Sequence, residues 1–426
     1  MRKLKKQFKT LYLKILNSLV FYPVLIIFFF FLSSVLLLSY ETSLSTQFFK
    51  DYLSFLYLED VDTSRDILST LIASILSLMV FSFSMVMIVL SQASTNYSPR
   101  LLPQLISDTK RQIILGIYGG TLIHCILVLI ALGSGDSNTS ERGISVMVAS
   151  ILGLLCIILF VIYIQNISSV IRIDIIVKDV FFKTESLLDH QLSLKPYEST
   201  TDYDGWSTVY SSKTGYFKCF DTELIDPKNF PHFDADIHVL PYEYKHVWEG
   251  EVILKVDGSL NEDMRENLIR AIIITEDRYK GQSITNGLIK LMEVVVKAIS
   301  SAKNDPGTAT DVMHKIGRLL RLSLRLPEMT YVDTNDYNGN LIQRNVGAKE
   351  LMRLIVQPIR NYSKSDSHVT EELLNTLNFL IADSKINTHY LDAVKDEIEL
   401  IKEDVEKYEK NENDRKRVLR LLDNNN

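Results

Sequence analysis

Four long stretches of the chain contain no Asp, Glu, Lys or Arg and consist mainly of apolar residues. They cover residues 15–40, 67–99, 112–135 and 144–171. A helix needs about 20 mostly apolar residues to cross a bilayer, so each stretch is long enough to form one transmembrane helix. The pattern therefore predicts a transmembrane four-helix domain over residues 1–171.

The first stretch follows a basic N-terminal segment, as the apolar core of a signal peptide would. A signal core is shorter, about 7–15 residues, and ends at a cleavage site made of small residues. Here the stretch is longer and ends with Tyr40 and Glu41. We therefore expect a helix that is retained.

The Lys and Arg residues beside the four stretches predict the orientation of the chain. Residues 1–14, 100–111 and 172–183 carry twelve basic residues together, whereas residues 41–66 and 136–142 carry three. Short basic segments stay on the cytoplasmic side of a membrane. We therefore expect the cytoplasm to contain the N-terminus, residues 100–111 and the whole part after residue 172. This agrees with an even number of spans.

The second predicted helix carries hydroxyl side chains at a spacing of three and four residues. They are Thr70, Ser74, Ser77, Ser84 and Ser91. That spacing places them on one face of the helix. The face could line a pore, or it could pack against another helix, because small residues allow helices to approach and hydroxyls can bond to their own backbone. Both interpretations hold together if packed helices surround an axis.

Small residues and one histidine mark the third and fourth predicted helices. Gly116 and Gly120, and likewise Ala149 and Gly153, lie four residues apart and predict close helix crossings. His124 continues the glycine face near the middle of its helix. An ionisable group in a membrane is a functional candidate by default; the alternative is a neutral imidazole bonded to a neighbouring hydroxyl.

No charged residue lies inside the four stretches. A coupled pump or antiporter usually needs one, so the sequence disfavours an active transporter. A passive pore needs none, because hydroxyls, carbonyls and apolar constrictions suffice. Four helices would form a poor conduit alone, so a pore would require a homo-oligomer with the conduit on its symmetry axis.

The pattern changes after the last apolar stretch. Residues 172–204 are expected to form a helical connector, and residues 205–260 contain aromatic, β-branched and glycine residues that predict a small β-rich subdomain. Residues 261–426 show mainly helical spacing, with a hairpin over residues 328–345. The expected fold class is a multi-pass α-helical membrane protein with four transmembrane helices and a C-terminal cytoplasmic α+β domain.

Two polar clusters of this domain are candidate ligand sites. His232, Asp234, Asp236 and His238 alternate with apolar residues, so on a strand they would share a face and could hold a divalent metal. The same alternation is typical of any half-buried strand.

The second cluster is Asn304, Asp305 and Thr308. Asn304 and Asp305 precede Pro306, which suits the first position of a helix, so they can simply cap that helix. An anion bound at the start of the helix is the alternative.

Composition removes several classes of function. The chain has 426 residues, a formal net charge of −6 and three cysteines. An acidic chain lacks the basic footprint of a nucleic-acid-binding protein, and Cys125 and Cys156 lie in apolar stretches, which excludes a disulfide scaffold. No phosphate-binding loop, nucleophile elbow or zinc motif occurs. We therefore expect no enzymatic activity and no cofactor, and as partners membrane lipid and further copies of the chain.

Three motifs occur in an order that resembles a bacterial family of predicted membrane proteins, domain of unknown function 2254. Residues 65–102 resemble its second span, residues 115–129 its third, and residues 304–309 its Asn-Asp-Pro-x-Thr-Ala segment. The chain departs from the family pattern at His124, where an aromatic residue is expected, and at residues 165–166, where histidines are expected. The resemblance implies a multi-span protein of the inner membrane with a cytoplasmic domain, and it implies no activity.

Two functions agree with these observations. The first is an oligomeric pore, or gated ion conductance, controlled by the cytoplasmic domain. The alternative is a non-conducting, membrane-anchored sensor or scaffold whose cytoplasmic domain binds a ligand or a partner.

Overall fold

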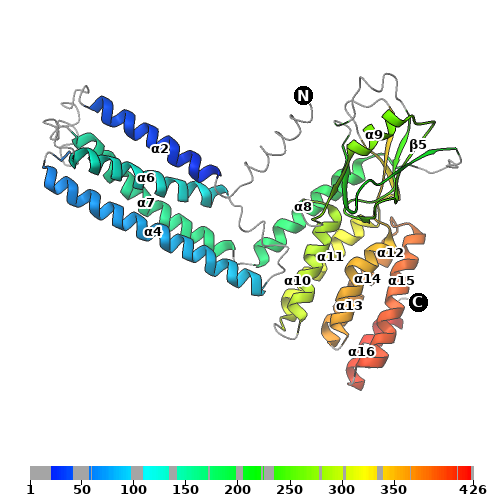
Figure 1. The fold of residues 1–426 in the computed structure, drawn as a ribbon. Coiled ribbons are helices and arrows are strands. Elements are labelled where there is room, and N and C mark those ends of the chain that lie inside the picture. Colours follow the sequence, from blue (N-terminus) through cyan, green and yellow to red (C-terminus); the bar gives the residue numbers. More distant parts are fainter. Residues whose placement is uncertain are drawn as a thin grey trace. The chain divides into compact units, whose positions relative to one another are not determined.

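The structure is a computed structural model. In it the chain forms two compact units, Met1–Ile175 and Ile176–Asn426. We call them the N-terminal and the C-terminal unit and describe each by itself (Figure 1). The structure describes residues 21–41, 57–58, 60–96, 109–133, 142–170, 173–197, 205–221, 224, 235–277, 281–300, 304–332, 339–364, 366–409 and 411–423.

Four long helices make up the described part of the N-terminal unit. They are α2 (Phe21–Tyr40), α4 (Val61–Asn96), α6 (Thr109–Gly133) and α7 (Gly143–Val170). All four are long and apolar enough to cross a membrane. The four predicted helices are therefore confirmed as helices.

The interior of the N-terminal unit is filled by packed side chains. Buried residues from α4, α6 and α7 form one cluster, which includes Leu68, Ile75, Tyr118, Cys125 and Tyr163. Leu68 and Ile75 lie seven residues apart in α4, so one face of this helix points into the cluster. The four helices of a single chain therefore enclose a core of side chains.

The described part of the C-terminal unit contains two sheets. Their strands are β1 (Ser207–Tyr210), β2 (Gly215–Phe220), β3 (Ile237–Val239), β4 (His246–Val247), β5 (Val252–Val256), β6 (Ile272–Thr275), β7 (Met329–Val332) and β8 (Leu341–Arg344). The five-stranded sheet has the order β1-β5-β3-β8-β7 and the three-stranded sheet the order β4-β2-β6. β3 and β8 run parallel, and the other paired strands are antiparallel. Both sheets and helix α9 (Glu262–Ala271) contribute to one apolar core around Phe217 and Leu254.

The other regular elements described in the C-terminal unit are helices. They are α8 (Ile173–Ser193, from Ile176 on), α10 (Ile284–Ile299), α11 (Pro306–Ser323), α12 (Ala348–Leu351), a π-helical turn (Met352–Val356), α13 (Gln357–Ser363), α14 (Ser367–Ile381), α15 (Thr388–Tyr408) and α16 (Glu412–Asp423). α10 packs on α11, α11 on α14, and α14 on both α15 and α16 (Figure 1). The helices are amphipathic, and their apolar faces meet between them.

The expected division of this unit at residue 260 is not how the chain packs. Strands β6, β7 and β8 follow residue 260 but pair with β2 and β3 or with each other. The connector expected over residues 172–204 is also part of the unit, because α8 buries Phe181 and Leu188. Local patterns predict single elements, whereas strand pairing over a hundred residues depends on the assembled core.

Candidate ligand-binding site

The hydroxyl residues of α4 lie on the face opposite its buried residues. Thr70, Ser74, Ser77, Ser84 and Ser91 are all exposed. Thr70, Ser77 and Ser84 donate hydrogen bonds of 2.8–2.9 Å to backbone carbonyls four residues earlier. Among the residues that the structure describes, this face therefore neither lines an interior channel nor packs against another helix.

The small residues of α6 and α7 lie at helix crossings. A Cβ atom at Gly116 would lie 2.9 Å from the Ile26 side chain of α2, and one at Gly120 would lie 2.5 Å from the Phe30 ring. In α7, Ala149 is fully buried, and Gly153 faces a leucine of α4. A Cβ atom at Gly119 would likewise lie 2.7 Å from Ile27, so the close approach of α2 to α6 depends on three residues without side chains.

His124 joins three segments of the N-terminal unit. Its Nδ1 lies 2.8 Å from the hydroxyl of Ser34 in α2, and its Nε2 lies 3.2 Å from the carbonyl oxygen of Ser145 in α7. The backbone N–H of Ser145 donates to Glu41 at 2.9 Å, and its hydroxyl bonds to the same carboxylate. All four residues are buried. The contact with Ser34 is the hydroxyl contact expected if His124 is a neutral imidazole without a functional role. The burial of Glu41 was not predicted from the sequence.

Asn304, Asp305 and Thr308 form a tight connection between α10 and α11. Asp305 caps α11: its carboxylate accepts a hydrogen bond from the Thr308 N–H at 3.1 Å and one from the Thr308 hydroxyl at 2.7 Å. Asn304 has a φ of 45°, a left-handed conformation that asparagine tolerates. The geometry is that of a helix cap.

The candidate metal cluster is described only in part, because His232 and Asp234 lie outside the described residues. Asp236 accepts two hydrogen bonds from Asn340, and His238 is buried with its ring against Tyr197 and Trp206. Burial lowers the pKa of His238. Among the described residues, no group of three or more side chains could hold a metal ion.

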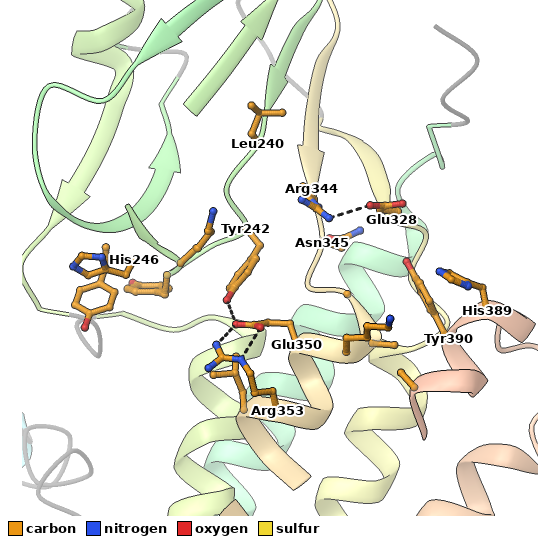
Figure 2. A pocket seen from close by; sticks show the side chains of 18 residues that line it. Leu240, Tyr242, His246, Glu328, Arg344, Asn345, Glu350, Arg353, His389 and Tyr390 are labelled. Atoms are coloured by element: carbon orange, nitrogen blue, oxygen red, sulfur yellow. Dashed lines mark hydrogen bonds and ion pairs between the residues drawn. The ribbon is translucent and has the colours of Figure 1, made fainter. Parts of the chain in front are cut away.

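A cavity of about 790 Å³ opens in the C-terminal unit between the strands and the helices (Figure 2). Its volume lies in the usual range for small-molecule sites, about 300–1,000 Å³. Its wall comes from four parts of the chain: β2 with the segment leading into β4, the ends of β7 and β8, α12 with the π-helical turn, and the start of α15. The lining residues are Tyr216, Leu240, Tyr242, Tyr244, Lys245, His246, Glu328, Arg344, Asn345, Gly347, Ala348, Lys349, Glu350, Arg353, Leu354, His389, Tyr390 and Ala393.

A network of polar side chains lines this cavity (Figure 2). The Tyr242 hydroxyl donates to Glu350 at 2.6 Å. Arg353 donates to both oxygens of the same carboxylate, at 2.6 and 2.9 Å. Arg344 and Glu328 form an ion pair of 3.2 Å nearby. Both carboxylates that line the cavity are therefore already paired with an arginine.

Two unusual backbone segments border the cavity. Proline lacks an N–H group, and its ring collides with the carbonyl four residues earlier, so Pro358 strains a regular helix around Leu354. The chain widens there into the π-helical turn that carries Arg353 and Leu354. Such turns are rare and frequent at functional sites. Tyr244 lines the cavity too, and its φ of 65° is uncommon for a residue other than glycine.

A smaller cavity of about 60 Å³ adjoins the first and shares Tyr242, Arg344 and Asn345 with it. Glu243 lines this smaller space. Burial raises the pKa of Glu243 to about 7, although the nearby charge of Lys218 opposes the shift. The region therefore holds a carboxyl group that titrates near neutral pH.

Sequence reasoning identified none of these cavity residues. Two local signals were present: the aromatic residues Tyr242 and Tyr244 that flank Glu243, and the spacing of Glu350 and Arg353, three residues apart on a helix. Neither signal indicates which distant segment of the chain these side chains contact.

Four helices that can cross a membrane, followed by an α+β unit with a ligand-sized cavity, define the class as a multi-pass membrane protein. The chain belongs to the DUF2254 family of predicted membrane proteins, which it matches over residues 16–378. The resemblance predicted from the sequence is thereby confirmed. The match ends before the start of α15, so His389 and Tyr390 of the cavity lie outside it.

Two relatives are uncharacterized proteins of Mycobacterium tuberculosis and Mycobacterium bovis. Each is 22% identical to this chain over 382 residues, which covers 84% of this chain and 71% of the relative. No solved structure matches the chain.

Proposed function

We propose that this protein is a membrane-anchored sensor whose C-terminal unit binds a small molecule in the large cavity. The cavity itself is the observation that carries this proposal. It has the size of a ligand site, it is lined by charged and aromatic side chains, and two unusual backbone segments border it.

The position of the cavity supports a sensing role. A ligand in it would contact both the strand side, at Tyr242, and the helix side, at Glu350, Arg353 and Tyr390. Occupancy would therefore favour the arrangement in which these segments lie close together, because a ligand stabilises the state that it binds better.

Helix α8 offers a route from this unit towards the membrane. In sequence it begins three residues after the end of α7. Its Glu185 pairs with Arg318 of α11 at 2.9 Å, and the same arginine lies over the ring of Phe181 at 4.7 Å. A change in the helices of the C-terminal unit would therefore reach α8, the helix that follows α7 in the sequence.

The cellular location is part of the proposal. Twelve basic residues flank one side of the predicted spans and three flank the other, which supports cytoplasmic N- and C-termini. The cavity would then sample small molecules of the cytoplasm, with the spans in the bacterial inner membrane.

Tryptophan fluorescence tests this function on the full-length protein in detergent. The chain has two tryptophans, Trp206 and Trp248, and the Trp248 ring lies 4.5 Å from the ring of His246, a cavity residue. Trp206→Phe leaves Trp248 as the single reporter. We expect pools of cytoplasmic metabolites to contain at least one that shifts its emission saturably and raises the midpoint of thermal unfolding.

Trp248→Phe is the matched control, because it should remove the emission shift but keep the thermal stabilisation. Pools that produce neither effect, across anionic, neutral and cationic metabolites, would contradict a sensor that uses this cavity.

A second candidate function is an oligomeric pore, and one observation favours it. The hydroxyl face of α4 points away from the core of its own unit, so several copies could place this face around a common axis. The hydroxyls of Thr70, Ser77 and Ser84 already bond to their own helix, which also makes the face tolerable against lipid. Homo-oligomerisation is therefore part of this second proposal and not a requirement of the first.

Ion flux into liposomes decides between the two functions. A pore predicts flux above that of empty liposomes and its loss in the double variant Ser77→Leu, Ser84→Leu. The sensor predicts no flux with either protein.

A further inference from the structure

We propose that the large cavity selects an anion carried on a planar ring, that is, a phosphate-bearing ring compound of the nucleotide type. The inference rests on the proposed sensor function, and it names the chemical class of the ligand.

The charge of the cavity wall is the first argument. Four cationic side chains line it, Lys245, Arg344, Lys349 and Arg353, against two carboxylates, Glu328 and Glu350. Lys245 also pairs with Glu251 at 2.8 Å, so an excess of one positive charge remains. The whole chain is acidic, with a formal net charge of −6. A positive hollow in an acidic protein concentrates anions, because a concave surface of one sign focuses the electrostatic field.

The pairing of these charges is the second argument. Glu350 already uses both oxygens for Arg353 and Tyr242, so it offers little to a cationic ligand. Lys349 is exposed and forms no ion pair or side-chain hydrogen bond with any residue that the structure describes. The pair of Arg344 with Glu328 is half exposed on both sides and hence weak, so Arg344 can exchange it for a phosphate.

The rings in the wall are the third argument. Tyr216, Tyr242, Tyr244 and Tyr390 line the cavity together with His246 and His389. The Tyr216 and His246 rings already contact each other edge to face, with centroids 5.1 Å apart. Aromatic walls favour planar ligands, because ring faces and edges attract one another. A ring compound of mononucleotide size also suits a cavity of about 790 Å³.

The test uses the full-length Trp206→Phe protein in detergent, with the emission of Trp248 as the readout. The probes are ADP, adenosine and inorganic pyrophosphate. We expect ADP to bind, adenosine to bind at least about tenfold more weakly, and pyrophosphate to displace ADP, since a charge-assisted contact contributes about a factor of ten. ADP affinity should fall as the salt concentration rises.

Two variants locate the effect. Lys349→Ala and Arg344→Ala should each weaken ADP binding about threefold to tenfold, as the loss of a partly exposed charged contact does. Lys385→Ala is the control, because Lys385 is exposed and does not line the cavity; its affinity should match that of the parent. Lys349 and Arg344 are both exposed, so the variants should fold.

The outcomes separate this inference from the sensor function. Adenosine binding as tightly as ADP, or unchanged ADP binding in both variants, would overturn the anion assignment and leave the sensor in place. Absence of any ADP or pyrophosphate binding at millimolar concentration overturns the assignment too, and a metabolite of another class that shifts Trp248 would then still support the sensor.

Discussion

The Tyr242 hydroxyl and the Glu350 carboxylate lie 2.6 Å apart although 108 positions of the sequence separate the two residues. Their hydrogen bond joins the segment that leads into β4 to the helix that begins at α12, in the wall of the cavity (Figure 2). Arg353 binds the same carboxylate from the next helical turn. The three side chains hold the two walls of the cavity at a defined distance.

This contact should show measurable coupling. Tyr242→Phe removes the donor and Glu350→Gln removes the charge, so in a double-mutant cycle we expect an interaction energy of about 1 kcal/mol. The free energy of unfolding can be followed in urea by tryptophan emission, because both tryptophans lie in the C-terminal unit. Tyr210→Phe, at an exposed tyrosine of β1, should change it by less than about 0.5 kcal/mol. A coupling near zero would mean that the two walls are held by other contacts.

Asp383 should make the C-terminal unit sensitive to acid. Burial alone would raise its pKa, but hydrogen bonds from Arg321 at 2.6 Å, from the backbone N–H of Lys385 at 3.0 Å and from Arg325 at 2.8 Å lower the pKa to about 2. A carboxyl whose pKa is lower in the folded state stabilises the fold above its unfolded pKa of about 3.9, and this stability is lost as the pH falls towards 2. Asp383→Asn should therefore reduce the free energy of unfolding at pH 7 by about 2 kcal/mol.

The same variant should flatten the decline of stability between about pH 5 and pH 2, which urea unfolding across this range measures. The exposed Asp311 of α11 serves as the control, and Asp311→Asn should leave the acid decline intact. Equal acid sensitivity of the parent and Asp383→Asn would show that the two arginines do not hold this carboxyl charged.

Glu243 should have the opposite effect on the pH dependence of stability, because its pKa is raised in the folded state. Its pKa of about 7 in the folded state lies above the unfolded value of about 4.3, so the protonated form is favoured by folding. The resulting stability is present below about pH 4 and is lost as the pH rises through 7. Glu243→Gln cannot ionise, and we expect it to exceed the parent in stability at pH 8 by about 1–3 kcal/mol, with a smaller difference at pH 5. Urea unfolding at the two pH values checks this, and a variant that loses stability at pH 8 would contradict it.

The crossing of α2 and α6 should not tolerate a side chain at Gly120. A Cβ atom there would lie 2.5 Å from the Phe30 ring, so Gly120→Leu should destabilise the N-terminal unit by about 1–3 kcal/mol through overpacking. Thermal unfolding in detergent, followed by circular dichroism, measures the loss. Gly133→Ala is the control in the same helix, since nothing lies within 4 Å of its added Cβ atom; an equal loss in both variants would refute the crossing.

The membrane helices were predictable because one local quantity, the length of an uncharged apolar stretch, decides them. The helix boundaries still differ from the apolar stretches. α4 begins at Val61, ahead of the stretch that starts at residue 67, because a helix continues through polar residues such as Asp62 and Arg65. The four-residue spacing of Gly116 and Gly120 is likewise visible within one helix, and an added Cβ atom at either position would lie against α2.

The candidate site was not predictable from the same information. Its walls come from segments that are separated by most of the C-terminal unit, and their meeting depends on the parallel pairing of β3 with β8. The burial of Glu41 shows the same limit. In the sequence this residue follows an apolar stretch and looks like an ordinary acidic loop residue. Only the structure shows that Ser145, near the start of α7, lies against it.

Hydrogen–deuterium exchange of the full-length protein tests the sensor account most directly. The chain in detergent is compared with and without a metabolite extract of bacterial cells below about 3 kDa. The account predicts slower exchange in the cavity segments, residues 240–246, 347–354 and 388–393, with no change in α16. Unchanged exchange in all three segments, or protection confined to other parts of the chain, would contradict it.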